Sequence, residues 1–313
     1  MSTELIDRLR FLALDDRRQA HRELGKTLPR LAGDTLGRAQ LVLAGLAATK
    51  GRVRKARTLA TESATLIESE AGSVELVGLR LSLLRDTGQL LQALRLARSA
   101  ASADYHDLDS WRVAHYNLGL IEGAVGNTDR ASHSWSEAAR CSRVLYRVGA
   151  MVNLARDLLD AGELGSATRI LKQADRDETP RVLTAFRFDT WARVLAERGH
   201  WPKAIKSQEA CLGLLVDESS LRIARHTTTL VSYLVRAGLD QRAQATLDAA
   251  KSLVFDLEDE RQELAAAAMV NLMKAATARK LTSAVVDSAL RLLDKASRWD
   301  RSNPRPASKS RQS

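Results

Sequence analysis

Proline is scarce in this chain, and its scarcity is the first guide to the fold. The 313 residues include five prolines, and only Pro180 and Pro202 lie between Pro29 and Pro304. Proline lacks a backbone N–H and clashes with the preceding helical turn, so a long stretch that nearly excludes it favours helix. Aromatic residues make up 4% of the chain. Sheets favour aromatic and β-branched residues, whereas Leu, Ala and Arg dominate here, which excludes an all-β fold.

Cysteine and long apolar runs are also rare. The two cysteines, Cys141 and Cys211, are too few for a disulfide framework and lack the spacing of a metal site. We interpret each as a small buried hydrophobic residue. The longest apolar run, residues 41–48, is far shorter than the roughly 18 residues of a membrane-spanning helix. Residues 1–14 mix charges into their apolar positions, unlike a signal peptide. These features predict a cytoplasmic protein.

Positive charge is concentrated near the two ends of the chain. The net charge is +10, of which residues 1–57 carry +7 and residues 298–313 carry +4. A protein that follows nucleic acid along its length is expected to be basic along a continuous face. One basic patch brackets an expected helix–helix turn, at a helix N-terminus where the helix dipole disfavours cations. The patch consists of Arg52, Arg54, Lys55 and Arg57. An anionic partner would offset that cost, but a solvated surface explains the patch better, because isolated surface charges cost little.

A glycine followed five residues later by an alanine recurs six times, at intervals of 36 to 39 residues. Glycine adopts the left-handed conformation that ends a helix, and alanine lets two helices pack closely. The residue seven places before each glycine is small in most copies, as Gly119 is. The pattern indicates a tandem repeat of helix pairs. Its members are Gly51/Ala56, Gly88/Ala93, Gly126/Ala131, Gly162/Ala167, Gly199/Ala204 and Gly238/Ala243.

These residues resemble the tetratricopeptide repeat (TPR). The best copy comprises Leu118, Gly119, Gly126, Ala131, Trp135 and Ala138. The period exceeds the family's usual length of about 34 residues and is similar to the longer variant of bacterial regulatory proteins and peptide receptors. The resemblance covers about residues 15–297. It implies an all-α fold, a right-handed α-solenoid of about eight antiparallel helix pairs.

The same resemblance predicts the domain organisation. We expect one helical-repeat domain over residues 1–297, with atypical end caps at 1–34 and 256–297, because a repeat array needs end units with a polar outer face. In the last pair Arg279-Lys280 replaces the turn glycine, between helices expected near 258–279 and 281–297. Residues 298–313 lack apolar periodicity, which predicts a basic disordered tail.

No motif for catalysis is present: the sequence has no phosphate loop, no zinc-protease motif and no nucleophile elbow. Residues 104–109 contain three carboxylates and an imidazole that could hold a divalent metal ion. Loop polarity, with Asp109 or Ser110 capping the next helix, explains the segment better. We therefore predict a non-enzymatic protein with no metal and no cofactor.

In the repeats that this chain resembles, the first helix of each pair lines a concave groove. The residues nine and six places before each turn share one helix face, and from the third repeat onward they are rich in Asn, Thr and cations. The candidate groove residues are Asn117, Asn153, Arg156, Thr190, Arg193, Thr229, Asn271 and Lys274. Amides can bond a peptide backbone, and cations can bond acidic side chains or a terminal carboxylate. A polar face is also expected on any solvent-facing helix.

Two functions follow from these features. The first is a non-enzymatic receptor or scaffold, with a regulatory role, that binds a protein or an acidic peptide in the groove. The alternative is a nucleic-acid-associated regulator that uses the basic N-terminal repeats and the tail. The charge distribution favours the first. We expect no membrane partner, and homo-oligomers remain an option.

Overall fold

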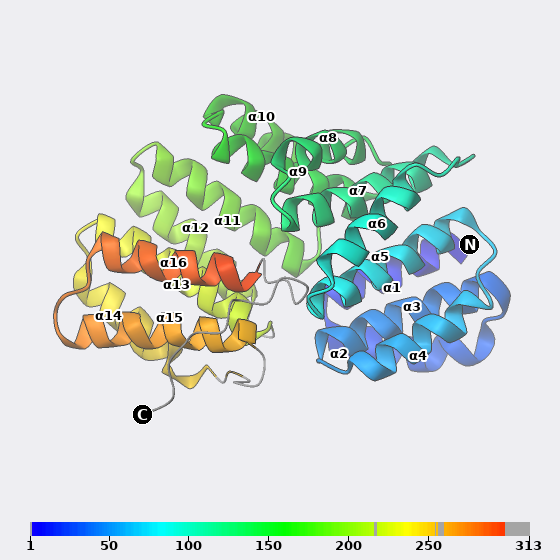
Figure 1. Cartoon of the computed structure of the whole chain (residues 1–313), viewed down its shortest axis with the longest axis horizontal. Coiled ribbons are helices and arrows are strands. Elements are labelled where there is room, and N and C mark those ends of the chain that lie inside the picture. The colour runs from blue at the N-terminus through cyan, green and yellow to red at the C-terminus, as the bar shows by residue number, and fades with distance from the viewer. Residues whose placement is uncertain (1, 216–217, 254, 256–259, 298–313) are drawn as a thin grey trace. The chain divides into compact units, whose positions relative to one another are not determined.

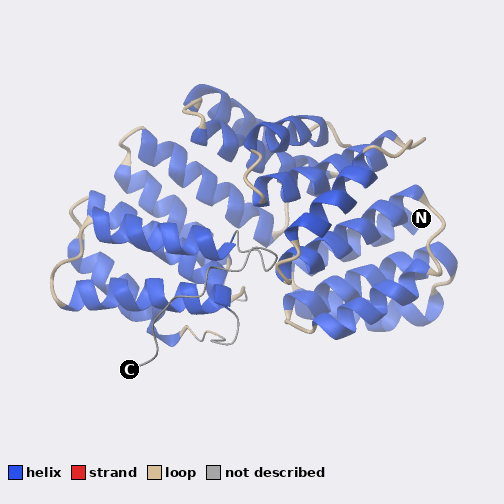
Figure 2. Cartoon of the chain, viewed as in Figure 1, coloured by secondary structure: helices blue, strands red, loops and turns tan. Residues whose placement is uncertain are grey.

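The structure is a computed structural model that describes residues 2–215, 218–253, 255 and 260–297. These residues form sixteen α-helices, two short 3₁₀ helices and no strand (Figures 1 and 2). The expected all-α solenoid class is confirmed, and the helices follow one another as eight consecutive pairs. The tail predicted at residues 298–313 lies outside the described part of the chain. No helix in that described part is both long and apolar enough to cross a membrane.

The chain divides into two compact units, and the boundary falls between Tyr146 and Arg147. Unit 1 contains the first four helix pairs, a 3₁₀ helix and the first turn of α9. Its elements are α1 (Ser2–Asp15), α2 (Arg17–Thr27), η1 (Leu28–Arg30), α3 (Gly33–Thr49), α4 (Val53–Ala64), α5 (Glu70–Asp86), α6 (Leu90–Ala101), α7 (Leu108–Ala124) and α8 (Thr128–Ala138).

Unit 2 contains the rest of α9 and the remaining helices. Its elements are α9 (Val144–Asp160), α10 (Leu164–Ala174), α11 (Arg181–Glu197), α12 (Trp201–Leu214), α13 (Ser220–Arg236), α14 (Asp240–Ala249), η2 (Ala250–Ser252), α15 (Glu260–Thr277) and α16 (Ser283–Ser297). The single domain over residues 1–297 and its two caps stay predictions.

The turns within the helix pairs share one backbone geometry. All six repeat glycines have a left-handed backbone, with φ between 70° and 88°. After Gly126, the N–H of Asn127 donates to the Glu122 carbonyl at 2.8 Å, which is the closure of a Schellman motif. The last pair has the same closure, with Lys280 N–H donating to Ala275 O at 2.8 Å, and here the left-handed residue is Arg279, with φ 54°. Arg279 therefore takes the place of the glycine.

Alanines pack the two helices of each pair together. All six alanines of the repeat pattern are fully buried. Cys141 and Cys211 are buried as well, which confirms their assignment to the interior. In the best repeat copy, a Cβ built on Gly119 would lie 2.8 Å from the Trp135 ring. The small residue of the first helix thus makes room for the indole of the second.

Carboxylates in the first turns of α3, α5 and α7 tie each repeat to the next. Asp34 accepts a hydrogen bond from Ser69 N at 3.0 Å, and Glu70 accepts one from Asp107 N at 2.9 Å. Asp109 accepts one from Ser142 N at 3.0 Å. The backbone N–H groups of Asp107 and His106 lower the pKa of the half-buried Glu70. Each carboxylate therefore fixes the loop that precedes the next first helix.

This arrangement explains the acidic segment at residues 104–109. Asp107 is the N-cap of α7, and its carboxylate accepts hydrogen bonds from Asp109 N at 3.1 Å and Ser110 N at 2.9 Å. The capping residue expected from the sequence, Asp109 or Ser110, was therefore wrong by a few positions, because Asp109 already lies inside the first turn. The segment's polarity is used for capping and for the link to the next repeat.

Candidate functional site

Four of the predicted groove residues form a polar face on the first helices of unit 2. Asn153 and Arg156 lie on α9, Arg193 on α11 and Thr229 on α13, and all four side chains are half-buried. Arg193 makes an ion pair with Asp160 on α9, with Nη1 2.7 Å from Oδ1. This ion pair connects α9 with α11. We call these four residues the polar face of unit 2.

Arg156 differs from the other arginines of this region because it makes no hydrogen bond and no ion pair with a described residue. The charges that act on it come from Arg225 and Arg193 and from Asp189 and Asp160. Burial, and then the positive charge of Arg225, lower the pKa of the Arg156 guanidinium. Arg193 and Arg225 are already paired with carboxylates. Arg156 is therefore a charged side chain of this face that makes no ion pair with a described carboxylate.

Two other predicted groove residues are buried, contrary to expectation. Asn117 on α7 is 6% exposed, and its Nδ2 donates to the carbonyl of Val74 on α5 at 3.2 Å. Gly78, opposite, leaves space for the amide, because a Cβ there would lie 3.0 Å from Asn117 Oδ1. Thr190 on α11 is 1% exposed, and its hydroxyl donates to Phe186 O at 2.9 Å. The prediction that these two side chains face an open groove is wrong.

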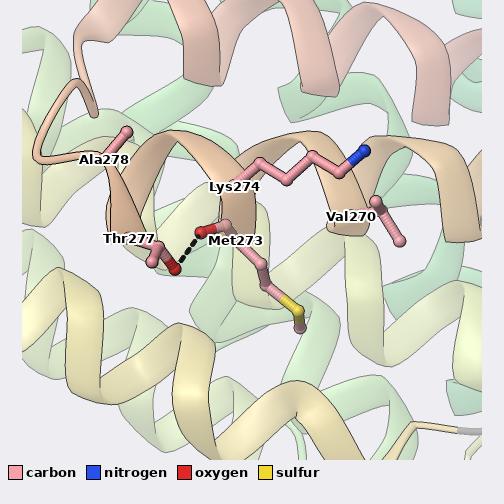
Figure 3. Close-up of a pocket in the computed structure, with 5 residues that line it drawn as sticks. All are labelled: Val270, Met273, Lys274, Thr277 and Ala278. Carbon is pink, nitrogen blue, oxygen red and sulfur yellow. Dashed lines mark hydrogen bonds between the residues drawn. The ribbon is translucent and has the colours of Figure 1, made fainter.

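The last repeat was aligned one residue too far along the chain. Because Arg279 is the left-handed residue, the positions equivalent to the groove register are Val270 and Met273, and not Asn271 and Lys274. Asn271 and Lys274 are both exposed. Lys274 and the two apolar residues line a shallow cavity of about 400 Å³ together with Thr277 and Ala278 (Figure 3). This side of α15 is mostly apolar, with one cation.

Helix α16 packs on the face of α13 that the repeat register assigns to the groove. Arg225 and Arg236 lie thirteen and two residues before Gly238 and share a helix face with Thr229. Arg225 makes an ion pair with Asp294 at 2.9 Å, and Arg236 makes one with Asp287 at 2.9 Å. Sequence reasoning missed this contact because it paired α16 only with α15. The part of the polar face that is free of α16 is therefore on α9 and α11.

The basic patch at residues 52–57 lies on the surface of unit 1. Helix α4 begins at Val53, directly after Arg52, so the patch lies at a helix N-terminus as expected. Arg52, Arg54, Lys55 and Arg57 are all exposed, and none makes an ion pair with a described residue. The patch is available to an anionic partner.

Unit 1 also contains a buried ionic cluster that the sequence did not reveal. The Glu75 carboxylate on α5 accepts hydrogen bonds from Arg38 on α3 at 2.9 Å, from Arg143 at 2.6 Å and from Arg10 on α1. Burial alone would raise the pKa of Glu75, but the charge of Arg10 and the hydrogen bonds of Arg10 and Arg38 lower it from 4.5 to about 2. The one available signal is that Arg38 and Glu75 are 37 residues apart, one repeat period.

Comparison with known proteins gives the fold. No family model matches the chain, and no curated protein matches it. Among solved structures, the Rap protein in complex with Competence and Sporulation Factor is similar with a TM-score of 0.62 at 12% identity, covering 95% of this chain and 86% of Rap. NprR in complex with its cognate peptide NprX has a TM-score of 0.51 at 15% identity, covering 94% of this chain and 95% of NprR.

A third similar structure is Cut9, from the Cut9–Hcn1 hetero-tetramer of the APC/C. Its TM-score is 0.62 at 13% identity, over 90% of this chain and 54% of Cut9. At such identities these likenesses concern the fold alone. The chain has the tetratricopeptide-type helical-repeat fold that its sequence resembles.

Proposed function

We propose that this protein is a regulatory peptide-binding protein without catalytic activity, and that it binds its ligand on the polar face of unit 2. The observation that carries the proposal is Arg156, a half-buried cation that makes no ion pair with a described residue and lies one helical turn after Asn153. Two proteins of similar fold support it, since NprR is solved with a cognate peptide and Rap with Competence and Sporulation Factor.

The chemistry of the polar face defines the ligand. A guanidinium binds a carboxylate with two parallel hydrogen bonds, and such bonds are stronger than neutral ones. Asn153, one helical turn before Arg156, makes no hydrogen bond to a described residue, and its amide can both donate to and accept from a peptide backbone. Arg193 is held by Asp160 and is less available. The ligand is therefore a peptide with an acidic side chain or a free C-terminal carboxylate at Arg156.

Selection from a peptide library on the full chain tests the proposal. Selected peptides are compared in binding to the wild type, to Arg156→Ala and to a control, Arg169→Ala, which removes an exposed arginine of α10. We expect Arg156→Ala to weaken binding by about 10-fold or more, the equivalent of about 1.4 kcal/mol. Its stability should change by about 0.5 kcal/mol or less, because no intramolecular partner is lost. Equal binding by the wild type and both variants would contradict the proposal.

Nucleic-acid binding through the basic patch is the second candidate, and the observation in its favour is the exposure of all four cations. Binding that depends on phosphate contacts falls steeply as salt rises. The test is affinity for a DNA duplex and for a single-stranded RNA at low and physiological salt, with Arg52, Arg54, Lys55 and Arg57 all changed to Ala. Tight, salt-sensitive binding that the quadruple variant loses would establish this function, and binding that the variant retains would exclude the patch.

A further inference from the structure

Three side chains of metal-binding type meet between helices α11, α12 and α13. Asp189 lies on α11, Cys211 on α12 and His226 on α13. His226 Nδ1 is 2.9 Å from Asp189 Oδ1 and 3.7 Å from Cys211 Sγ, and the three donor atoms all lie within 4.8 Å of one another. Cys211 and His226 are buried, and the side chain of Asp189 is 20% exposed. One oxygen, one nitrogen and one sulfur donor thus converge just below the surface of unit 2.

Hydrogen bonding accounts for part of this arrangement, since His226 Nδ1 lies 2.9 Å from Asp189 Oδ1 and Gln208 Nε2 donates to the His226 carbonyl at 3.2 Å. Three groups approach the single atom His226 Nδ1, since Gln208 Nε2 lies 3.4 Å away in addition to Asp189 and Cys211. A ring nitrogen offers one proton or one lone pair, so it makes one good hydrogen bond. Gln208 is itself fully buried, and its Oε1 has no hydrogen-bond partner in the described part of the chain. A buried amide oxygen without a partner is costly.

The spacing of the donor atoms agrees with a tetrahedral zinc site. Bonds of about 2.3 Å to sulfur and about 2.0 Å to nitrogen and oxygen place neighbouring donors about 3.6 Å apart for S–N and about 3.3 Å apart for N–O. The distances from His226 Nδ1, 3.7 Å to Cys211 Sγ and 2.9 Å to Asp189 Oδ1, differ from these by a few tenths of an ångström.

Gln208 lies beside these three side chains but is not one of the donors, because its Nε2 donates to the His226 carbonyl at 3.2 Å.

We propose that Asp189, Cys211 and His226 form a binding site for one Zn²⁺ ion in unit 2. A thiolate, an imidazole and a carboxylate together favour zinc over magnesium or calcium, which prefer oxygen donors alone. The two anionic ligands balance the charge of the ion. Cys211 loses its proton on binding, so the affinity rises with pH. The positive charges of Arg156 and Arg225 also act on Asp189 and compete with the ion for it.

We expect the bound ion to stabilise the fold, because its ligands come from three different helices. An ion held by α11, α12 and α13 would join one complete helix pair to the first helix of the next. The proposal does not require peptide binding at Arg156, although the charge of Arg156 acts on the ligand Asp189.

Metal titration of the untagged full chain tests the site. The protein is made metal-free with a chelator, and Zn²⁺ is titrated in competition with a chromophoric chelator. We expect one tight site per chain. Cobalt in place of zinc should give a thiolate-to-cobalt charge-transfer band and the intense visible bands of a four-coordinate ion. Cys211→Ser should abolish the charge-transfer band and weaken zinc binding by at least about 100-fold, since even outer-shell changes cost 10- to 100-fold.

Cys141→Ser is the matched control, because it removes the other buried cysteine and lies in unit 1. It should keep the site, and zinc should raise the melting temperature of this variant and of the wild type but not of Cys211→Ser. If Cys211→Ser fails to fold, Asp189→Asn and His226→Gln are assessed by the same measurements. The absence of a tight site in the wild type overturns the proposal, and so does zinc binding that none of these ligand variants weakens.

Discussion

Small residues decide how closely the two helices of a pair approach each other, and Gly119 is the clearest case. We predict that Gly119→Ala destabilises the protein by about 1–3 kcal/mol, because the new methyl group meets the buried Trp135 ring at 2.8 Å. Gly123→Ala on the same helix is the control, since its Cβ would only reach Ala131 Cβ at 3.8 Å. That change should be neutral or stabilising by up to about 1 kcal/mol. Urea unfolding measures both, and equal effects would contradict the packing described.

The asparagines of the repeat register have different roles in the two units. We predict that Asn117→Ala costs about 1–2 kcal/mol, because it removes the buried hydrogen bond to Val74 O and leaves that carbonyl without its donor. Asn153→Ala should change stability by about 0.5 kcal/mol or less, since Asn153 is half-buried and makes no such bond. Thermal melting of the two variants checks the contrast. Similar losses for both would mean that Asn153 is structural as well.

Single residues show where sequence reasoning succeeded and where it could not. The turn glycines and packing alanines were predictable because each meets a local requirement. The glycines adopt a left-handed backbone, and the alanines allow a close contact between helices. The burial of Asn117 was not, since it depends on Gly78 in a different repeat. Cys211 was correctly expected to be buried, but its neighbours Asp189 and His226 lie 22 and 15 residues away on other helices. No ligand spacing along the chain connects them.

At the level of the helix pair, the turn between α15 and α16 has an arginine where the six repeat turns before it have a glycine. Arg279 has a left-handed backbone, which costs a residue with a Cβ about 1–2 kcal/mol. We predict that Arg279→Gly stabilises the protein by about 0.5–1 kcal/mol, after the extra flexibility of glycine in the unfolded chain is taken into account. Arg279→Ala, which keeps a Cβ, should show no gain. A melting temperature that falls in the glycine variant would show that the Arg279 side chain stabilises the turn.

The same turn explains why the end of the predicted groove was misplaced. A helix turns by about 100° per residue, so a register error of one residue selects a different face. Counting from Lys280 gave Asn271 and Lys274, whereas counting from Arg279 gives Val270 and Met273. Without a glycine to mark the turn, the sequence had no means to choose between the two.

At the scale of the whole molecule, the Glu75 cluster connects segments far apart in the chain, since Arg143 also pairs with Asp7 at 3.0 Å. The folded pKa of Glu75 lies below its ordinary value of 4.5, at about 2, so its contribution is complete above pH 4.5 and is lost as the pH falls toward 2. The shift corresponds to about 3 kcal/mol. We predict that the stability difference between wild type and Glu75→Gln shrinks by this amount between pH 5 and pH 2.

Urea unfolding followed by circular dichroism at several pH values measures that difference. Glu137→Gln, which removes an exposed surface pair with Arg140, is the control and should follow the wild type at every pH. Parallel pH profiles for wild type and Glu75→Gln would show that the cluster is not linked to protonation of Glu75.

The fold class could be predicted because six copies of one signal agree, and errors in single copies average out. The division into two units could not. It falls between Tyr146 and Arg147, inside the first turn of α9. The glycine period continues from Gly126 to Gly162 across this point, and no proline marks it. Unit boundaries depend on long-range contacts that a local repeat pattern does not encode.

The position of α16 also bears on how such a chain can evolve. A repeat array can lengthen by gene duplication when each helix pair contacts only its neighbours. An inserted copy then forms the same interfaces with the pairs on both sides of it. Helix α16 adds specific charges to the contact with its neighbour, since Asp294 and Asp287 pair with Arg225 and Arg236 of the preceding pair. A pair inserted between α14 and α15 would carry both carboxylates away from α13. Duplication can therefore extend this protein upstream of Ser220, while its C-terminal four helices must be inherited as one block.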